Sequence, residues 1–194
     1  MSVTTRILTG EALTAALDDV ARLRIAVFRD WPYLYDGDLE YERNYLTAYQ
    51  SPGAVVVVAE GEGRIGGAST GAPMTDHADD FAAAFADRPE PLSQIFYCAE
   101  SVLLPDWRGH GLGHAFFDAR ENHARALGLR YAAFCSVIRP ADHPDRPADY
   151  RPLDGFWRKR GYEPLPGVIA TFSWKDRGQP AQTDKQLQFW MREL

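Results

Sequence analysis

The run Arg108-Gly109-His110-Gly111-Leu112-Gly113 constrains this chain more than any other segment of its sequence. It lies between an apolar stretch, Ser101–Pro105, and a segment with helical spacing, His114–Leu127. Glycines let backbone N–H groups approach an anion, and the first turn of a helix leaves its N–H groups unpaired. A strand, a glycine-rich turn and a helix N-terminus therefore predict a site for a phosphate-bearing ligand. The alternative is a tight turn that only requires glycine.

Helical and strand-like patterns alternate along the chain and predict one α/β (α+β) domain over residues 1–194. The proline-rich stretch Arg139–Pro152 is expected to be a loop. Strands are predicted at Val3–Leu8, Ala54–Glu60, Arg64–Ala72, Ile95–Leu104, Tyr131–Ile138, Val168–Trp174 and Gln186–Met191. Helices are predicted at Glu11–Phe28, Asp38–Tyr49, Thr75–Asp87, His114–Leu127 and Asp154–Arg160.

Charge and cysteine content narrow the class of protein. The formal net charge is −6 and the lysines and arginines form no run, which argues against nucleic acid or an anionic membrane as a main partner. Cys98 and Cys135 stand in apolar runs and are expected to be buried, reduced thiols. The N-terminal residues do not resemble a signal peptide, and no apolar run is long enough to span a bilayer. A cytoplasmic protein is predicted.

Two local patterns resemble other kinds of site and are interpreted differently. Gly61–Gly66 matches G-x-G-x-x-G, but further glycines follow it instead of a helix, so a hairpin turn is expected. His110 and His114 are four residues apart, as in helical zinc sites. No third ligand accompanies them, and no metal is predicted.

The segment Leu103–Gly113 resembles the acetyl-CoA-binding motif of the GNAT acetyltransferase superfamily, whose signature is R/Q-x-x-G-x-G/A. Phe156–Tyr162 is similar to the F-Y-x-x-x-G-F segment of the same family. The resemblance implies a mixed, mostly antiparallel sheet of about seven strands flanked by helices. It also implies two parallel strands that splay apart around the donor.

The resemblance assigns donor-binding roles to particular residues. Backbone N–H groups of Gly109, His110, Gly111, Leu112 and Gly113 would hold the pyrophosphate of acetyl-CoA. Arg108 would lie beside it, because its guanidinium suits phosphate oxygens. Exposed backbone of Leu103 and Leu104 would pair with the pantetheine arm as an added strand does. The reaction implied is acetyl transfer to an amine.

Such a transfer requires removal of a proton from the amine and stabilisation of the departing thiolate. Glu100 is the only carboxylate within Phe96–Pro105, and it is the candidate base or water-positioning residue. Strand residues alternate in direction, so Glu100 and Ser101 cannot share a face without a bulge. The family's acidic tyrosine aligns with Trp157, which leaves Tyr150 or Tyr162 as the acid, or no dedicated acid.

The acceptor site is expected near Phe28–Asp38, where Tyr33, Tyr35 and Asp36 would suit a cationic amine. Arg139, His143, Arg146 and Arg151 in the proline-rich loop would instead suit an acceptor with a carboxylate. The two groups of residues favour opposite kinds of acceptor. The predicted function is N-acetylation of a small or amino-acid-like molecule, and the alternative is a non-catalytic acyl-CoA-binding module. A homodimer through the final strand pair is a further hypothesis.

Overall fold

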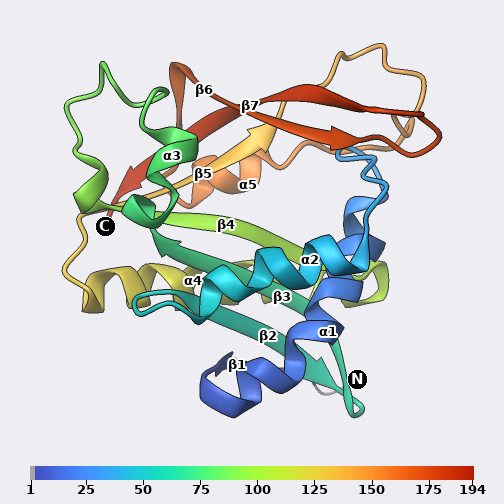
Figure 1. The fold of residues 1–194 in the computed structure, drawn as a ribbon, viewed down its shortest axis with the longest axis horizontal. Helices are drawn as coiled ribbons and strands as arrows, with labels where there is room; N and C mark the ends of the chain where they lie inside the picture. The colour runs from blue at the N-terminus through green and yellow to red at the C-terminus, as the bar shows by residue number, and fades with distance from the viewer. Residues whose placement is uncertain (1–2) are drawn as a thin grey trace.

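One mixed sheet holds the seven strands of the computed structural model, which describes residues 3–194 (Figure 1). The spatial order is β1-β2-β3-β4-β5-β7-β6, and only β4 and β5 are parallel neighbours. This confirms the predicted fold class. The strands are β1 (Thr4–Leu8), β2 (Val55–Gly61), β3 (Arg64–Pro73), β4 (Ile95–Leu103), β5 (Tyr131–Val137), β6 (Glu163–Lys175) and β7 (Gln182–Glu193).

Helices cover both faces of the sheet (Figure 1). The longer helices are α1 (Gly10–Phe28), α2 (Leu39–Thr47) and α4 (Leu112–Ala126), and the short ones are α3 (Ala78–Phe81) and α5 (Asp154–Lys159). Val56 and Val58 of β2 pack with α1 and α2, whereas Val55 and Val57 pack with α4. Burial on both faces explains why β2 is continuously apolar. No helix within residues 3–194 is long and apolar enough to cross a membrane.

Most predicted elements are present, and two segments differ. The predicted helix Thr75–Asp87 contains only a 3₁₀ turn, Met74–His77, and the single α-helical turn α3. Phe81 and Phe85 both insert into the core, so tertiary contacts set this conformation, and a segment so short does not sustain a helix. The last two strands extend well beyond their predicted ends, because polar residues outside the apolar runs pair with one another across β6 and β7.

The parallel pair β4–β5 separates soon after it begins. Only Ile95–Tyr97 of β4 pairs with Tyr131–Ala133 of β5. The rest of β5 remains paired with β7, and the rest of β4 remains paired with β3. The gap between the strands therefore exposes an edge of β4 inside the sheet. This confirms the predicted splay of two parallel strands.

The segment Gly61–Gly66 is a hairpin connection, as predicted. Glu62 and Gly63 adopt positive φ angles of 54° and 73° between β2 and β3. Gly66 lies against the fully buried indole of Trp107, and a Cβ atom there would stand 1.9 Å from Trp107 Cε2. The last glycine of this pattern is therefore required for packing against the segment that precedes the Arg108–Gly113 loop.

The substitution Gly66→Ala is expected to lower the free energy of unfolding by about 3 kcal/mol, because the added methyl group displaces the Trp107 indole. Gly155→Ala is the matched control, since a Cβ atom on that α5 residue meets no atom within 4 Å. Denaturant unfolding of both variants measures the difference. Equal stabilities would contradict the close packing of Trp107 on Gly66.

Candidate functional site

The predicted phosphate-binding loop joins the 3₁₀ turn Pro105–Trp107 to α4. Gly109 and Gly111 have φ angles of 81° and 76°, and a Cβ atom on either would meet no atom within 4 Å. Gly111 is the N-cap residue of α4 and has no side chain to satisfy the amides of the first turn. The loop thus leaves open space at both glycines and uncapped amides at the start of α4, as an anion site at a helix N-terminus requires.

Arg108 and His110, the polar side chains of this loop, contact the backbone nearby. Arg108 is exposed and donates from Nε and Nη2 to the carbonyl of Leu103, at 3.3 Å each. His110 Nδ1 lies 3.0 Å from the carbonyl of Arg108. The guanidinium of Arg108 therefore remains beside the loop, where an arriving phosphate could recruit it.

The two residues predicted to pair with pantetheine differ in their free backbone groups. The amide of Leu104 donates to the Gly66 carbonyl at 3.0 Å, and its carbonyl accepts from the Trp107 amide at 2.9 Å. Leu103 precedes it, so the backbone groups of Leu103 are directed away from β3. Leu103 could therefore pair with a ligand arm in the gap through its amide, and its carbonyl would become available when Arg108 turns away from it.

β4 contains one extra residue at the point where it leaves β5. Thr70 of β3 stands opposite Glu100, whereas Ala72 stands opposite Tyr97. Two steps on β3 thus correspond to three on β4, which defines a β-bulge. Because of this bulge, Cys98 packs in the cluster beneath α4 while Glu100 faces α1 on the other side of the sheet.

Arg120 of α4 supplies the donors that hold this bulge. Its side chain is only 1% exposed, and Nη1 donates to the carbonyls of Thr70 at 3.2 Å and Glu100 at 2.8 Å. Nη2 donates to Ser101 Oγ at 2.8 Å. Ser101 therefore faces α4, on the opposite side of the sheet from Glu100. The side chains of Glu100 and Ser101 do not meet on one face, even with the bulge.

The carboxylate of Glu100 belongs to a buried polar cluster between β4, α1 and α2. Arg24 Nη1 lies 2.5 Å from Glu100 Oε1, and Arg24 also pairs with Glu42. Tyr45 donates to Glu100 Oε2 at 3.2 Å, and its hydroxyl lies 2.8 Å from that of Tyr49. Burial alone would lower the pKa of Arg24, but the two carboxylates raise it well above its usual range. Arg24 is therefore a fixed cation.

Tyr33, from the predicted acceptor segment, is close to this cluster. Its ring packs against Phe28, at 4.5 Å between ring centroids, and against Trp174 at 5.8 Å. Burial raises the pKa of the Tyr33 hydroxyl, and the charges of Cys135 and Glu100 raise it further. The hydroxyl thus shares its surroundings with β4 and with the separated end of β5.

Tyr35 and Asp36 are committed to other contacts. Burial and the neighbouring Glu42 carboxylate raise the pKa of Tyr35. Asp36 pairs with Lys175 at 2.6 Å and with Arg29 at 3.2 Å, and these partners lower its pKa. Asp36 therefore has no uncompensated charge to offer an amine.

The predicted carboxylate-binding arginines are also engaged. Arg139 forms a two-pronged pair with Asp176, at 2.8 and 2.9 Å, and donates to the carbonyls of Pro32 and Tyr33. This contact fastens the acceptor segment to the end of β6. Arg146 lies over the ring of Tyr150 at 5.2 Å. His143 packs on Trp31 at 5.1 Å between ring centroids, and Arg151 is exposed.

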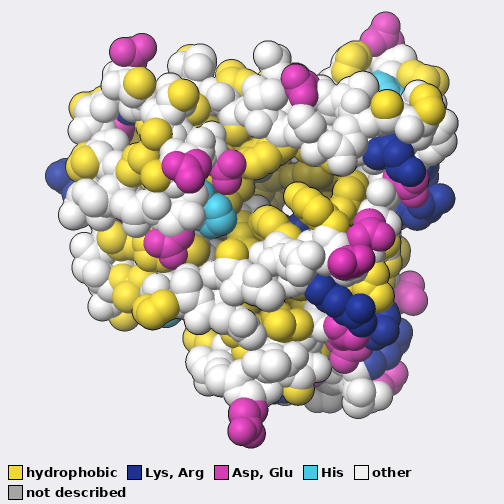
Figure 2. All heavy atoms as spheres, in the orientation of Figure 1, with side chains coloured by type: hydrophobic (Ala, Val, Ile, Leu, Met, Phe, Trp, Pro, Cys, Tyr) yellow, Lys and Arg dark blue, Asp and Glu magenta, His cyan; other side chains and the backbone are white. Residues whose placement is uncertain are grey.

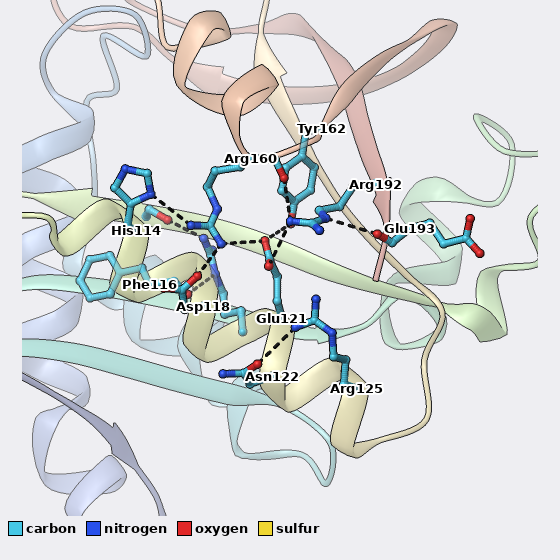
Figure 3. Close-up of polar contacts among 12 residues, drawn as sticks. His114, Phe116, Asp118, Glu121, Asn122, Arg125, Arg160, Tyr162, Arg192 and Glu193 are labelled. Atoms are coloured by element: carbon cyan, nitrogen blue, oxygen red, sulfur yellow. Dashed lines mark hydrogen bonds and ion pairs between the residues drawn. The ribbon is translucent and has the colours of Figure 1, made fainter.

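The two candidate acids occupy different environments. Tyr162 is fully buried, and its hydroxyl donates to Glu121 at 3.1 Å within the polar network between α4, α5 and β7 (Figure 3). Tyr150 is only partly buried, and its charge is among those that raise the pKa of Tyr33. Tyr150 packs against Trp31, at 5.9 Å between ring centroids, whereas Tyr162 lies in the core. Trp157 packs on Phe134 and Trp190.

Hydrogen bonds and ion pairs around Glu121 hold α4, the helix that follows the glycine loop, in place. Glu121 is 3% exposed and accepts from Arg192 at 3.3 Å, while Arg160 lies 3.1 Å from it (Figure 3). Arg160 also donates to Asp118 at 2.6 Å. These contacts fix α4 against α5 and β7, so the open N-terminus of α4 has a defined position.

Three residues of the site were not predicted from the sequence: Arg24, Tyr45 and Arg120. A signal exists for the two arginines, since each interrupts an apolar stripe at four-residue spacing. Arg24 stands four residues from both Val20 and Phe28, and Arg120 stands four residues from both Phe116 and Ala124. Tyr45 gives no comparable signal, because its phenol suits a core position or a polar one equally.

Comparisons with solved structures identify the fold. The Salmonella typhimurium protein yncA, solved with its cofactor acetyl-CoA, superposes with a TM-score of 0.61 and 15% identity, over 100% of this chain and 95% of that one. Ribosomal-protein-alanine N-acetyltransferase from Brucella melitensis gives 0.59 and 18%, over 98% and 99% of the two chains. A GNAT-family acetyltransferase from Streptococcus pneumoniae gives 0.59 and 13%, over 100% of both.

This chain therefore has the GNAT acetyltransferase fold, as the sequence resemblance implied. A scan against protein-family models and a search of the curated proteins give no match. Within residues 3–194, no group of three or more histidine, cysteine, aspartate or glutamate side chains is arranged to hold a metal ion.

The substitution Arg120→Met is expected to lower the free energy of unfolding by about 3 kcal/mol, because it leaves the Thr70 and Glu100 carbonyls without donors. Arg125→Met, on the same helix, removes a guanidinium that bonds only to Asn122 at the surface, and it is the control. Thermal and denaturant unfolding compare the two. A loss in Arg120→Met no greater than in the control would show that the bulge does not need this guanidinium.

Proposed function

We propose that this protein transfers the acetyl group of acetyl-CoA to the primary amine of a small molecule. The observation that carries the proposal is the early separation of β4 from β5. The open glycine loop lies at the end of β4, and the buried Glu100 carboxylate lies on the separated part of the same strand. A donor and an acceptor can thus meet in one gap.

On the donor side, amides from Gly109 to Gly113 would hold the pyrophosphate, with Arg108 turning toward it. The exposed edge of β4 at Leu103 would pair with the pantetheine arm, as an added strand pairs with a sheet edge. The complex of yncA with acetyl-CoA supports this assignment, because that protein shares the fold. Acetyl-CoA supplies the activated acyl group.

The transfer itself is a nucleophilic substitution at the thioester. The amine nitrogen attacks the carbonyl carbon, a C–N bond forms, and the C–S bond breaks with its electron pair leaving on sulfur. Glu100 Oε2 would accept the proton that the amine loses, since Tyr45 already marks that oxygen as an acceptor. The buried cation of Arg120 lies under the bulge and would favour negative charge that develops on the thioester oxygen.

The departing thiolate has one candidate proton donor. Tyr150 would serve, since it is only partly buried and packs on Trp31 of the predicted acceptor segment, whereas Tyr162 is bonded to Glu121 in the core. One observation favours the second candidate function, a non-catalytic acyl-CoA-binding module: a packed indole, Trp157, stands where the family's acidic tyrosine is expected. Free-thiol release from acetyl-CoA with added amines distinguishes the two functions.

The substitution Gly111→Asp is expected to weaken acetyl-CoA binding by more than about tenfold, because it places a carboxylate where the pyrophosphate would lie. Aspartate tolerates the left-handed conformation, so the fold should persist. Gly63→Asp is the matched control, with a φ angle of 73° against 76° and the same open surroundings. Titration calorimetry measures both. Unchanged affinity in Gly111→Asp would mean that the loop is structural only.

The substitution Glu100→Gln is expected to lower kcat at least about 100-fold, because the amide cannot accept the amine proton. Acetyl-CoA affinity should remain unchanged, since the donor loop is untouched. Glu60→Gln, which removes a surface carboxylate paired with Arg6, is the control. Steady-state kinetics of CoA release compare the two variants. A normal kcat in Glu100→Gln would exclude this residue as the base.

A further inference from the structure

An apolar hollow opens on the face of the molecule that carries α2 and α3, beneath the β6–β7 hairpin (Figure 2). Contacts between aromatic rings join the elements around it. Tyr33 packs with Trp174, and Phe81 packs with Phe172 at 5.7 Å between ring centroids. His77 lies 5.2 Å from the ring of Tyr97. Figure 2 shows hydrophobic side chains in the hollow, which suit an apolar molecule.

In the buried cluster behind this hollow two carboxylates share one guanidinium, whereas Arg120 bonds to the Glu100 carbonyl and to Ser101 on the α4 side of the sheet. Arg24 is the single guanidinium of the buried cluster, and it is shared between Glu42 and Glu100. One cation therefore opposes two carboxylates in this cluster. Arg24 contacts Oε1 of Glu100, whereas the other oxygen, Oε2, accepts from Tyr45. This arrangement favours a bound ammonium group and disfavours a second anion.

The basic side chains around the hollow are already engaged by acceptors of the protein. Arg139 is occupied by Asp176 and two carbonyls, and Lys175 shares Asp36 with Arg29. Lys185 shares Asp176 with Arg139, at 3.4 Å, and donates to the carbonyl of Trp174 and to Thr183. A carboxylate on the acceptor would have to displace one of these partners, which leaves a buried charge unpaired.

Acidic side chains at the edge of the hollow also favour a cationic acceptor. Figure 2 shows acidic side chains beside the hollow, and those on the segment Met74–Phe81 are Asp76, Asp79 and Asp80. All three are exposed, and among the described residues only His77 lies within ion-pair distance, at 4.0 Å from Asp80. Their field attracts a cationic amine and repels an anion.

We propose that the acceptor is a primary amine with an apolar, aromatic or alkyl body and no carboxylate beside the amine. This inference rests on the proposed acetyl transfer and specifies its acceptor. It favours one of the two kinds of acceptor that the sequence left open, because Arg139, one of the residues expected to bind a carboxylate, is already engaged by Asp176 and two carbonyls.

Three acceptors of similar size test the proposal with the wild-type chain: 2-phenylethylamine, phenylalanine amide and phenylalanine. Release of CoA thiol gives kcat/KM for each, and calorimetry in the presence of CoA gives the affinity of each. We expect kcat/KM for 2-phenylethylamine to exceed that for phenylalanine by more than about tenfold, because the carboxylate of phenylalanine has no free cation to bind. Phenylalanine amide, which keeps the bulk without the negative charge, should resemble 2-phenylethylamine.

The possible outcomes test the proposed acceptor class and the proposed acetyl transfer separately. Equal or better use of phenylalanine overturns the acceptor class and leaves acetyl transfer intact, and its loss in Arg146→Gln would then locate the carboxylate site on the proline-rich loop. Binding of 2-phenylethylamine without thiol release supports the acceptor class and overturns the catalytic proposal. Neither binding nor turnover of any of the three overturns both.

Discussion

The hydrogen bonds of Arg120 to the bulged strand are the interaction on which the rest of the site depends. The bulge, the loss of β4–β5 pairing and the reversal of Glu100 all occur within a few residues after Tyr97. A bulge leaves backbone carbonyls without ladder partners, and unpaired carbonyls in a core are unfavourable. Arg120 satisfies two of them from beneath and packs on Phe117, at 4.8 Å from the ring centroid. A helix thus stabilises a defect in the sheet, and the defect creates the gap.

The donor side and the acceptor side of this gap differ in whether their polar groups already have partners. On the donor side, the backbone is left unpaired: Gly111 cannot cap α4, and the amides of its first turn face open space. On the acceptor side, the charged side chains of Arg24, Asp36 and Arg139 are already paired, and hydrophobic side chains line the hollow (Figure 2). A ligand with many acceptor oxygens suits the first side, and a ligand with a single positive group and an apolar body suits the second.

Local patterns in the sequence predicted most of the elements and the glycine-rich turn between β4 and α4. Periodicity located the strands, and glycine spacing identified the loop, because both depend on neighbouring residues. The side of the sheet that Glu100 faces depends on a register shift against β3, which no local pattern reveals. The engagement of Arg139 by Asp176 and of Tyr162 by Glu121 joins segments far apart in the chain. The sequence could name these residues but could not show which charges were already paired.

A crystal structure of the protein with CoA tests the central claim most directly. The account predicts that the pyrophosphate lies on the amides of Gly109–Gly113, that the pantetheine arm runs along β4 between β4 and β5, and that the sulfur ends beside the hollow near Glu100. Density for CoA outside this gap, or pantetheine that does not pass between β4 and β5, would contradict it.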